Sequence, residues 1–264
     1  AHCCGIAGFK PTQGRVPRSG HIISSAGYLH SLTHIGPMAR FVEDLPVLLD
    51  IIAGPDGQDP HIVDAGLRDH QKVELSTLRI AFYKTIGDVS TASAIDDAIE
   101  RTATALANEC LAVEEASPAC LADSYPLYYD LFHADGNAWV RALLRKAGTE
   151  RPHPYLAWAL QKRGAARSAE EFAALFGRWH RFRGEMLAFM KDFDAIICPV
   201  HSFPAFEHGS SKKSPFRNGF AFTITYNLTG WPAAAVCVGK TDSDLPIGVQ
   251  IVAPLWREDV VLAL

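Results

Sequence analysis

Residues 78–116 read LRIAFYKTIGDVSTASAIDDAIERTATALANECLAVEEA, and this stretch decides the fold class. The apolar runs LRIAFY and LAVEEA at its two ends predict short strands. Between them, Ile95 and Ile99 lie on one face of a helix, and Ser93 with Asp96 resembles a capping box at its start. Strand, helix and strand in this order form a βαβ unit. The sequence therefore predicts an α/β protein with parallel strands and helices on the faces of the sheet.

Periodic segments on either side extend this picture. Further strands are predicted at 195–199, 233–238 and 247–252. Further helices are predicted at 45–52, 123–147, 172–193, 220–228 and from 258 onward. Asp44 is expected to cap the first of these helices. The segment 172–193 has the strongest helical period and predicts a long helix with a wide apolar stripe that faces the core.

Composition excludes several classes of protein. The chain has 264 residues, 48% of them hydrophobic, and a formal net charge of -4. This charge offers no field that attracts nucleic acid, and no apolar run approaches the ~18 residues that a membrane-spanning helix needs. The six cysteines form no C-x-x-C pair. We therefore expect reduced thiols, a cytoplasmic location and no metal site.

Three segments carry a resemblance to one family, in that family's order. The first is GIAGFKPTQGRV at 5–16. The second is GPMAR at 36–40, followed by LLDIIAG at 48–54. The third is NLTGWPA at 227–233, followed by LPIGVQ at 245–250. Together they resemble the amidase signature family of serine hydrolases, while the middle of the chain matches only in its order of elements.

The resemblance implies a mixed, mostly parallel twisted sheet flanked by helices. The chain opens at Ala1 with sequence typical of the middle of a domain. We therefore expect residues 1–264 to be a fragment, the C-terminal part of a single amidase domain whose fold is incomplete on its N-terminal side. The family's catalytic Ser–Ser–Lys triad is expected upstream of Ala1. No catalytic residue is thus assigned within the chain, and the chemistry needs no metal or organic cofactor.

Lys10 lies within the first motif and needs its own interpretation. The following Pro11 favours an extended backbone at Lys10, and we expect the amine to satisfy nearby carbonyls or a carboxylate. A new Lys–Ser pair with one of the nearby serines is the less favoured interpretation. Those serines are Ser19, Ser24 and Ser25.

The resemblance also indicates an acyl-binding pocket. Phe220, Thr223 and Asn227 fall on one helix face. Family members that act on amino-acid amides have an acidic group at the position resembling Phe220. Phenylalanine there favours an apolar or aromatic acyl group and disfavours an aminoacyl-tRNA substrate, although the ring could also belong to the core. Further candidates for substrate binding are Tyr28, Phe203 and Tyr226, although for each of them the core is the more favoured interpretation.

The predicted function is hydrolysis of a carboxamide through an acyl-serine intermediate. The expected partner is a small-molecule amide and not nucleic acid, a homodimer is compatible with the sequence, and activity needs the family's N-terminal half. The chain alone is expected to supply pocket and scaffold, and to be inactive. Two alternatives stay open. They are a glutaminase-type A subunit of a tRNA-dependent amidotransferase and a non-catalytic amidase-like binding module.

Overall fold

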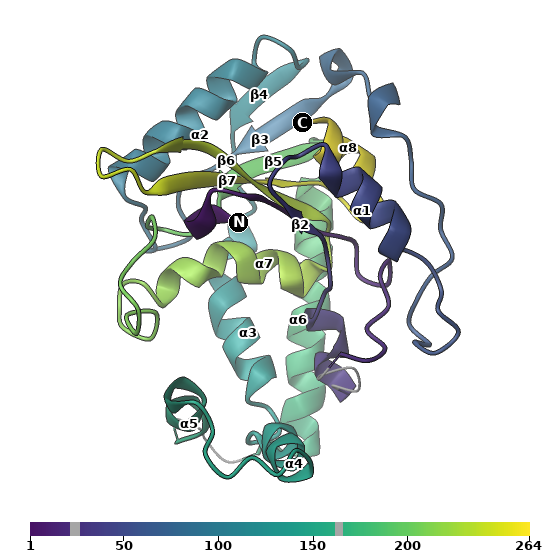
Figure 1. Cartoon of the computed structure of the whole chain (residues 1–264), viewed down its shortest axis with the longest axis vertical. Helices are drawn as coiled ribbons and strands as arrows, with labels where there is room; N and C mark the ends of the chain where they lie inside the picture. Colours follow the sequence, from purple (N-terminus) through teal and green to yellow (C-terminus); the bar gives the residue numbers. More distant parts are fainter. Residues whose placement is uncertain (22–26, 162–165) are drawn as a thin grey trace.

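A seven-stranded sheet lies between two layers of helices (Figure 1). The computed structural model describes residues 1–21, 27–161 and 166–264, and at 27 and 28 it describes the backbone only. The strand order is β2-β1-β6-β7-β5-β3-β4. The strands are β1 (Ala7–Lys10), β2 (Met38–Ala39), β3 (Arg79–Phe82), β4 (Ala112–Glu115), β5 (Ala195–Pro199), β6 (Ala233–Lys240) and β7 (Pro246–Val252).

The mixed α/β fold expected from the sequence is confirmed. One half of the sheet has parallel strand pairs and the other half has antiparallel pairs. Parallel pairing, predicted for most of the sheet, joins β4 to β3 and β3 to β5. The described pairings from β5 through β7, β6 and β1 to β2 are antiparallel. The crossover through the helix after β3 enforces parallel strands, whereas the short β6–β7 turn can only join antiparallel ones.

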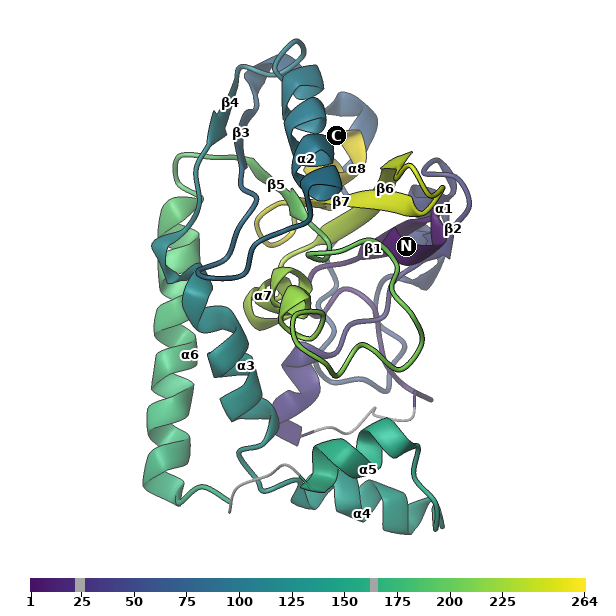
Figure 2. The same ribbon diagram turned by 90° about the vertical axis from the view of Figure 1, so that its left-hand side faces the viewer.

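Eight α-helices surround the sheet in the described ranges. They are α1 (Asp44–Ile52), α2 (Ser93–Leu106), α3 (Ser124–Phe132), α4 (Ala138–Lys146), α5 (Pro154–Gln161), α6 (Ala169–Phe189), α7 (Ala221–Thr229) and α8 (Glu258–Ala263). Helices α3, α6 and α7 pack together on one face, and α1, α2 and α8 cover the other. Figures 1 and 2 show α4 and α5 at the end of α6 that is remote from the sheet.

Alternation along the strands separates the two cores. On β5, Ile196 and Cys198 face the α3, α6 and α7 side, while Ala195 and Ile197 face the α1, α2 and α8 side. All four side chains are fully buried. A strand buried on both faces reads as a continuous apolar run, which is why the sequence AIICP predicts this strand with the correct bounds.

Several predicted helix boundaries need correction. Asp44 is the first residue of α1 and not its cap. The capping box at Ser93 does not form, because α2 begins at Ser93 and the Asp96 carboxylate accepts a hydrogen bond from the Thr91 hydroxyl instead. The predicted helix at 123–147 is divided in two by Asn137, whose φ of 63° lies in the left-handed region.

Candidate functional site

A cavity of about 280 Å³ lies between α7 and the β1–β6 part of the sheet. Its walls are mostly apolar, because β1 and β6 contribute small side chains at this point, and a few polar groups converge on it. Such a combination is typical of small-molecule sites. The lining residues are Ala1, Gly8, Phe9, Lys10, His34, Gly36, Met38, Val200, Thr223, Asn227, Ala233, Ala234, Ala235 and Gln250. We call this space the main cavity.

Gly36 allows the segment before β2 to reach this position. A Cβ atom built at Gly36 would lie 1.9 Å from the Phe9 carbonyl oxygen, a distance that no side chain can adopt. The absence of a side chain therefore lets the chain pass directly over β1. This close approach brings His34 and Met38 to the main cavity, and Met38, which is 69% exposed, marks where the cavity reaches the surface.

Two of the predicted substrate-binding residues line the main cavity. Thr223 and Asn227 are one helical turn apart on α7, so that both meet the same space. The Thr223 hydroxyl donates to the Phe220 carbonyl oxygen at 3.2 Å, which orients it along the helix. Contact of Thr223 and Asn227 with a substrate stays a prediction.

Phe220 and Phe203 lie in a neighbouring group of rings. Phe220 comes directly before α7, is 38% exposed, and meets the ring of His201 edge-on at 4.8 Å. Phe203 meets Phe216 edge-on at 5.1 Å, and Phe206 stacks against both Phe216 and His201. None of these rings lines the main cavity, so a role in holding an acyl group would require a ligand that extends beyond it.

Tyr226 points into the core instead of the main cavity. Its side chain is fully buried, and its hydroxyl lies 2.8 Å from the Tyr83 hydroxyl. Burial raises the pKa of both phenols well above the usual value, so both stay neutral. The side chain of Tyr28, the remaining predicted substrate-binding residue, lies outside the described residues.

The Lys10 amine has the partners that the sequence predicts for it. It donates hydrogen bonds to the carbonyl oxygens of Trp231 and, at 3.3 Å, of Pro11. The residue as a whole keeps some exposed surface, but the amine is enclosed, and this burial lowers the pKa of Lys10 to about 7. The Lys–Ser alternative gains no support, because the Ser19 hydroxyl bonds to Asp56. Ser24 and Ser25 lie outside the described residues.

Gln250 and His34 are cavity residues that sequence reasoning missed. The Gln250 side-chain amide donates to the carbonyl oxygens of Pro199 (3.4 Å) and Phe222 (3.2 Å), which fixes it between β5 and α7. Its place at the end of the motif LPIGVQ could have indicated a role. His34 precedes the motif GPMAR by two residues, and nothing in the sequence pattern signals its contribution.

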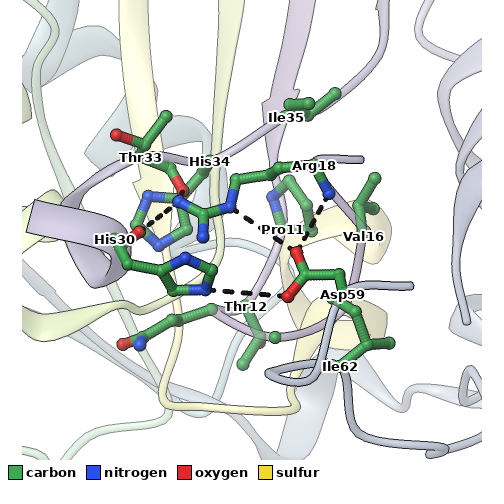
Figure 3. A pocket seen from close by; sticks show the side chains of 12 residues that line it. Pro11, Thr12, Val16, Arg18, His30, Thr33, His34, Ile35, Asp59 and Ile62 are labelled. Atoms are coloured by element: carbon green, nitrogen blue, oxygen red, sulfur yellow. Dashed lines mark hydrogen bonds and ion pairs between the residues drawn. The ribbon is translucent and has the colours of Figure 1, made fainter. Parts of the chain in front are cut away.

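A second, much smaller cavity adjoins His34 (Figure 3). Its volume of about 10 Å³ approaches the space that one water molecule needs. The Arg18 backbone donates to the Asp59 carboxylate at 3.1 Å, and the Arg18 guanidinium donates to the carbonyl oxygens of His30 and Thr33. Within the described part of the chain, Arg18 Nη2 and both ring nitrogens of His34 are buried without a hydrogen-bond partner. His34 lines both cavities.

Burial determines the protonation of His34. It lowers the pKa of the ring well below the usual value, and the nearby positive groups Lys10 and Arg18 lower it further. The imidazole is therefore neutral near pH 7, with one nitrogen that donates and one that accepts.

Two other kinds of feature are absent from the part of the chain that the structure describes. No group of three or more histidine, cysteine, aspartate or glutamate side chains in the described ranges could hold a metal ion. None of the helices described is both long enough and apolar enough to cross a membrane.

Comparison with known proteins places this geometry in context. The chain is 30% identical to the A subunit of glutamyl-tRNA(Gln) amidotransferase from Thermus thermophilus, over 97% of the chain and 58% of that protein. It is 27% identical to the 6-aminohexanoate-cyclic-dimer hydrolase of Paenarthrobacter ureafaciens, over 99% of the chain and 58% of that protein. The chain thus spans about three fifths of the length of these relatives.

Solved structures agree with the sequence relatives. The fold matches 6-aminohexanoate cyclic dimer hydrolase complexed with substrate with a TM-score of 0.83 at 26% identity, over 100% of this chain and 60% of that one. Fatty acid amide hydrolase shares the fold with a TM-score of 0.83 at 19% identity, over 100% of this chain and 52% of that one. The family model described as Amidase matches residues 1–262. The chain therefore belongs to the amidase family, the amidase signature enzymes that its motifs resemble.

Proposed function

We propose that the chain forms the acyl-binding part of an amide hydrolase that cleaves a carboxamide through an acyl-serine intermediate. One observation carries this proposal: Thr223 and Asn227 meet the small side chains of β1 and β6 around a 280 Å³ cavity. The polar pair can orient a carbonyl group, and the apolar walls favour an apolar or aromatic acyl group. A cytoplasmic location and a homodimer stay predictions from the sequence.

We further propose that the 264-residue chain supplies pocket and scaffold but hydrolyses no amide alone. Lys10 is a lining residue of the cavity, and its amine is bonded to carbonyl oxygens and not to a serine. A serine hydroxyl without a base is a poor nucleophile. Incubation with a chromogenic anilide should therefore give no release above the protein-free rate. Turnover that a serine-directed phosphonate blocks would contradict this proposal.

A binding experiment tests the pocket itself. Benzamide, titrated into the chain and followed by NMR, should shift signals of α7 and β6. Asn227→Ala should weaken binding about fivefold, because one hydrogen bond contributes about 1 kcal/mol and ~1.4 kcal/mol corresponds to a factor of ten. Asn108→Ala is the matched control, since the Asn108 side-chain amide donates to the Thr104 carbonyl oxygen near the end of α2. Equal affinities of the two variants would refute the assignment of the pocket.

The main alternative is a glutaminase-type A subunit of a tRNA-dependent amidotransferase. The 30% identity to such a protein from Thermus thermophilus favours it. The aromatic Phe220 argues against it. Titration with glutamine in place of benzamide separates the two proposals, because only the amidotransferase function predicts tighter binding of glutamine. A non-catalytic amidase-like binding module predicts benzamide binding and no hydrolysis in any complex.

A further inference from the structure

Lys10 differs from the lysines for which the structure gives ion pairs. Lys72, Lys84 and Lys240 lie near the surface and pair with carboxylates. Lys10 instead is the last residue of β1, and its amine donates hydrogen bonds to two backbone carbonyl oxygens. The acidic group that influences it is Glu258, whose two oxygens already accept hydrogen bonds from Arg15.

The number of partners matches a neutral amine. A neutral amine has two N–H donors and one lone pair, whereas an ammonium ion has three N–H donors. The two carbonyl oxygens take two donors. The remaining position lies on a side chain that lines the main cavity. A third N–H in this apolar space would be costly to leave unpaired, whereas a lone pair is tolerated there.

We propose that Lys10 is a nucleophilic amine that faces the main cavity and that small aliphatic aldehydes form an imine with it. The inference does not depend on amide hydrolysis, because it rests on the enclosed amine, on its two carbonyl partners and on the cavity that Lys10 lines. The cavity volume of about 280 Å³ accommodates a short aliphatic chain and excludes a large polycyclic one.

Imine formation balances with the Lys10 amine and the aldehyde as the two reactants. The Nζ lone pair adds to the carbonyl carbon, and the former carbonyl oxygen takes up a proton to give a carbinolamine. Loss of water then leaves the N=C bond of the imine. The proton that the oxygen takes up is the one that the nitrogen loses, so this step needs no further acid or base from the chain.

Reductive labelling tests the proposal on the intact 264-residue chain. The protein is treated at pH 7 with butanal and sodium cyanoborohydride, whose hydride reduces the imine to a stable secondary amine, and modified lysines are located by peptide mass spectrometry. Lys72, with a side chain 83% exposed, is the internal control. Lys10 should react at least about tenfold faster, because the burial that lowers its pKa to about 7 leaves about half of it neutral, against ~0.04% of an ordinary lysine.

Three further measurements make the test decisive. Pyrene-1-carboxaldehyde should label Lys72 but not Lys10, because it does not fit the cavity. The rate at Lys10 should level off above pH 8, while the rate at Lys72 continues to rise. Lys10→Arg should remove the fast site and leave Lys72 unchanged. Slower labelling of Lys10 than of Lys72 by butanal, or equal labelling of Lys10 by both aldehydes, would overturn the proposal.

Discussion

Lys10 and Arg15 lie five residues apart on one segment, yet Lys10 lines an open cavity whereas Arg15 forms a buried ion pair. Arg15 Nη2 lies 2.9 Å from Glu258 Oε2, with both side chains only 2% exposed. Its guanidinium also bonds to the Ala65 carbonyl oxygen and lies 4.6 Å from the centre of the Trp256 ring. Lys10 has carbonyl partners only.

This difference separates two kinds of buried polar group. The Arg15 ion pair stabilises the fold, whereas the polar groups beside the main cavity are available to a ligand. Buried polar groups are nearly always paired, so an incompletely paired one needs an explanation. Around Arg15 the pairing is complete, and we assign this region to stability. The ring nitrogens of His34 are buried without a partner in the described part of the chain, and the cavity that His34 and Lys10 line is where we expect a ligand to bind. Substitutions in the two regions should therefore have different consequences.

The largest effect should come from opening the closed pair. Glu258→Ala leaves the Arg15 guanidinium buried without its carboxylate, and breaking such a pair costs about 3–5 kcal/mol. Urea unfolding at pH 7 measures this loss. Lys240→Ala, which breaks the exposed pair with Asp244, is the control and should cost less than ~1 kcal/mol. Similar losses for the two variants would contradict the structural role of the Arg15 pair.

The protonation of Glu258 adds a pH dependence to this pair. Burial alone would raise the pKa of Glu258, but hydrogen bonds from Arg15 and Thr12 outweigh burial and lower it below the usual value. The folded state therefore releases this proton more readily than the unfolded state. This part of the stability is present above the unfolded pKa near 4.5 and should decrease as the pH falls below it, but not in Glu258→Ala.

A smaller loss of stability is expected when the buried, uncharged pair of tyrosine hydroxyl groups is broken. The Tyr83 and Tyr226 hydroxyl groups satisfy each other at 2.8 Å in the core. Either Tyr→Phe change leaves one hydroxyl without this partner and should cost about 1–3 kcal/mol. The double variant should lose less than the sum of the two single losses, because it removes both polar groups. Strict additivity in unfolding experiments would show that the two hydroxyls do not interact.

The smallest effect should come from the open region. Lys10→Met removes two hydrogen bonds but also removes an amine that is costly to bury, so we expect a change within about 2 kcal/mol at pH 7. Above pH 7 the unfolded lysine still binds a proton that the folded amine has lost. The stability of the unmodified chain should therefore rise toward pH 10, whereas Lys10→Met should lack this rise. A loss above about 3 kcal/mol, the scale of a broken buried pair, would assign Lys10 to the fold instead.

Local patterns account for what the sequence predicted well. The βαβ unit from β3 to β4 follows from apolar periods within one short segment, and the stripe of α6 follows from repeated aromatic residues. The family resemblance together with helical spacing placed Thr223 and Asn227 on one face, and both line the main cavity, while their binding of a substrate stays a prediction. The motif around Lys10 predicted carbonyl partners for the amine, and the carbonyl oxygens of Trp231 and Pro11 confirm this.

Contacts between distant segments account for what the sequence missed. His34 reaches the main cavity only because the chain at Gly36 passes over β1, and Gln250 arrives from β7, near the other end of the chain. Tyr226 was named as a pocket candidate that could also belong to the core, and its hydroxyl partner Tyr83 comes from the residue directly after β3. No periodicity within α7 could reveal that partner.

The position of His34 between two cavities has one more consequence, because this residue lines both of them. Shortening this residue to alanine should merge the 280 Å³ and 10 Å³ spaces into one elongated hollow that extends to Arg18. The guanidinium would then form the end wall of a longer tunnel. A chain with His34→Ala should accept extended amides that carry a terminal carboxylate, and unchanged affinity for such amides would show that the two chambers stay separate.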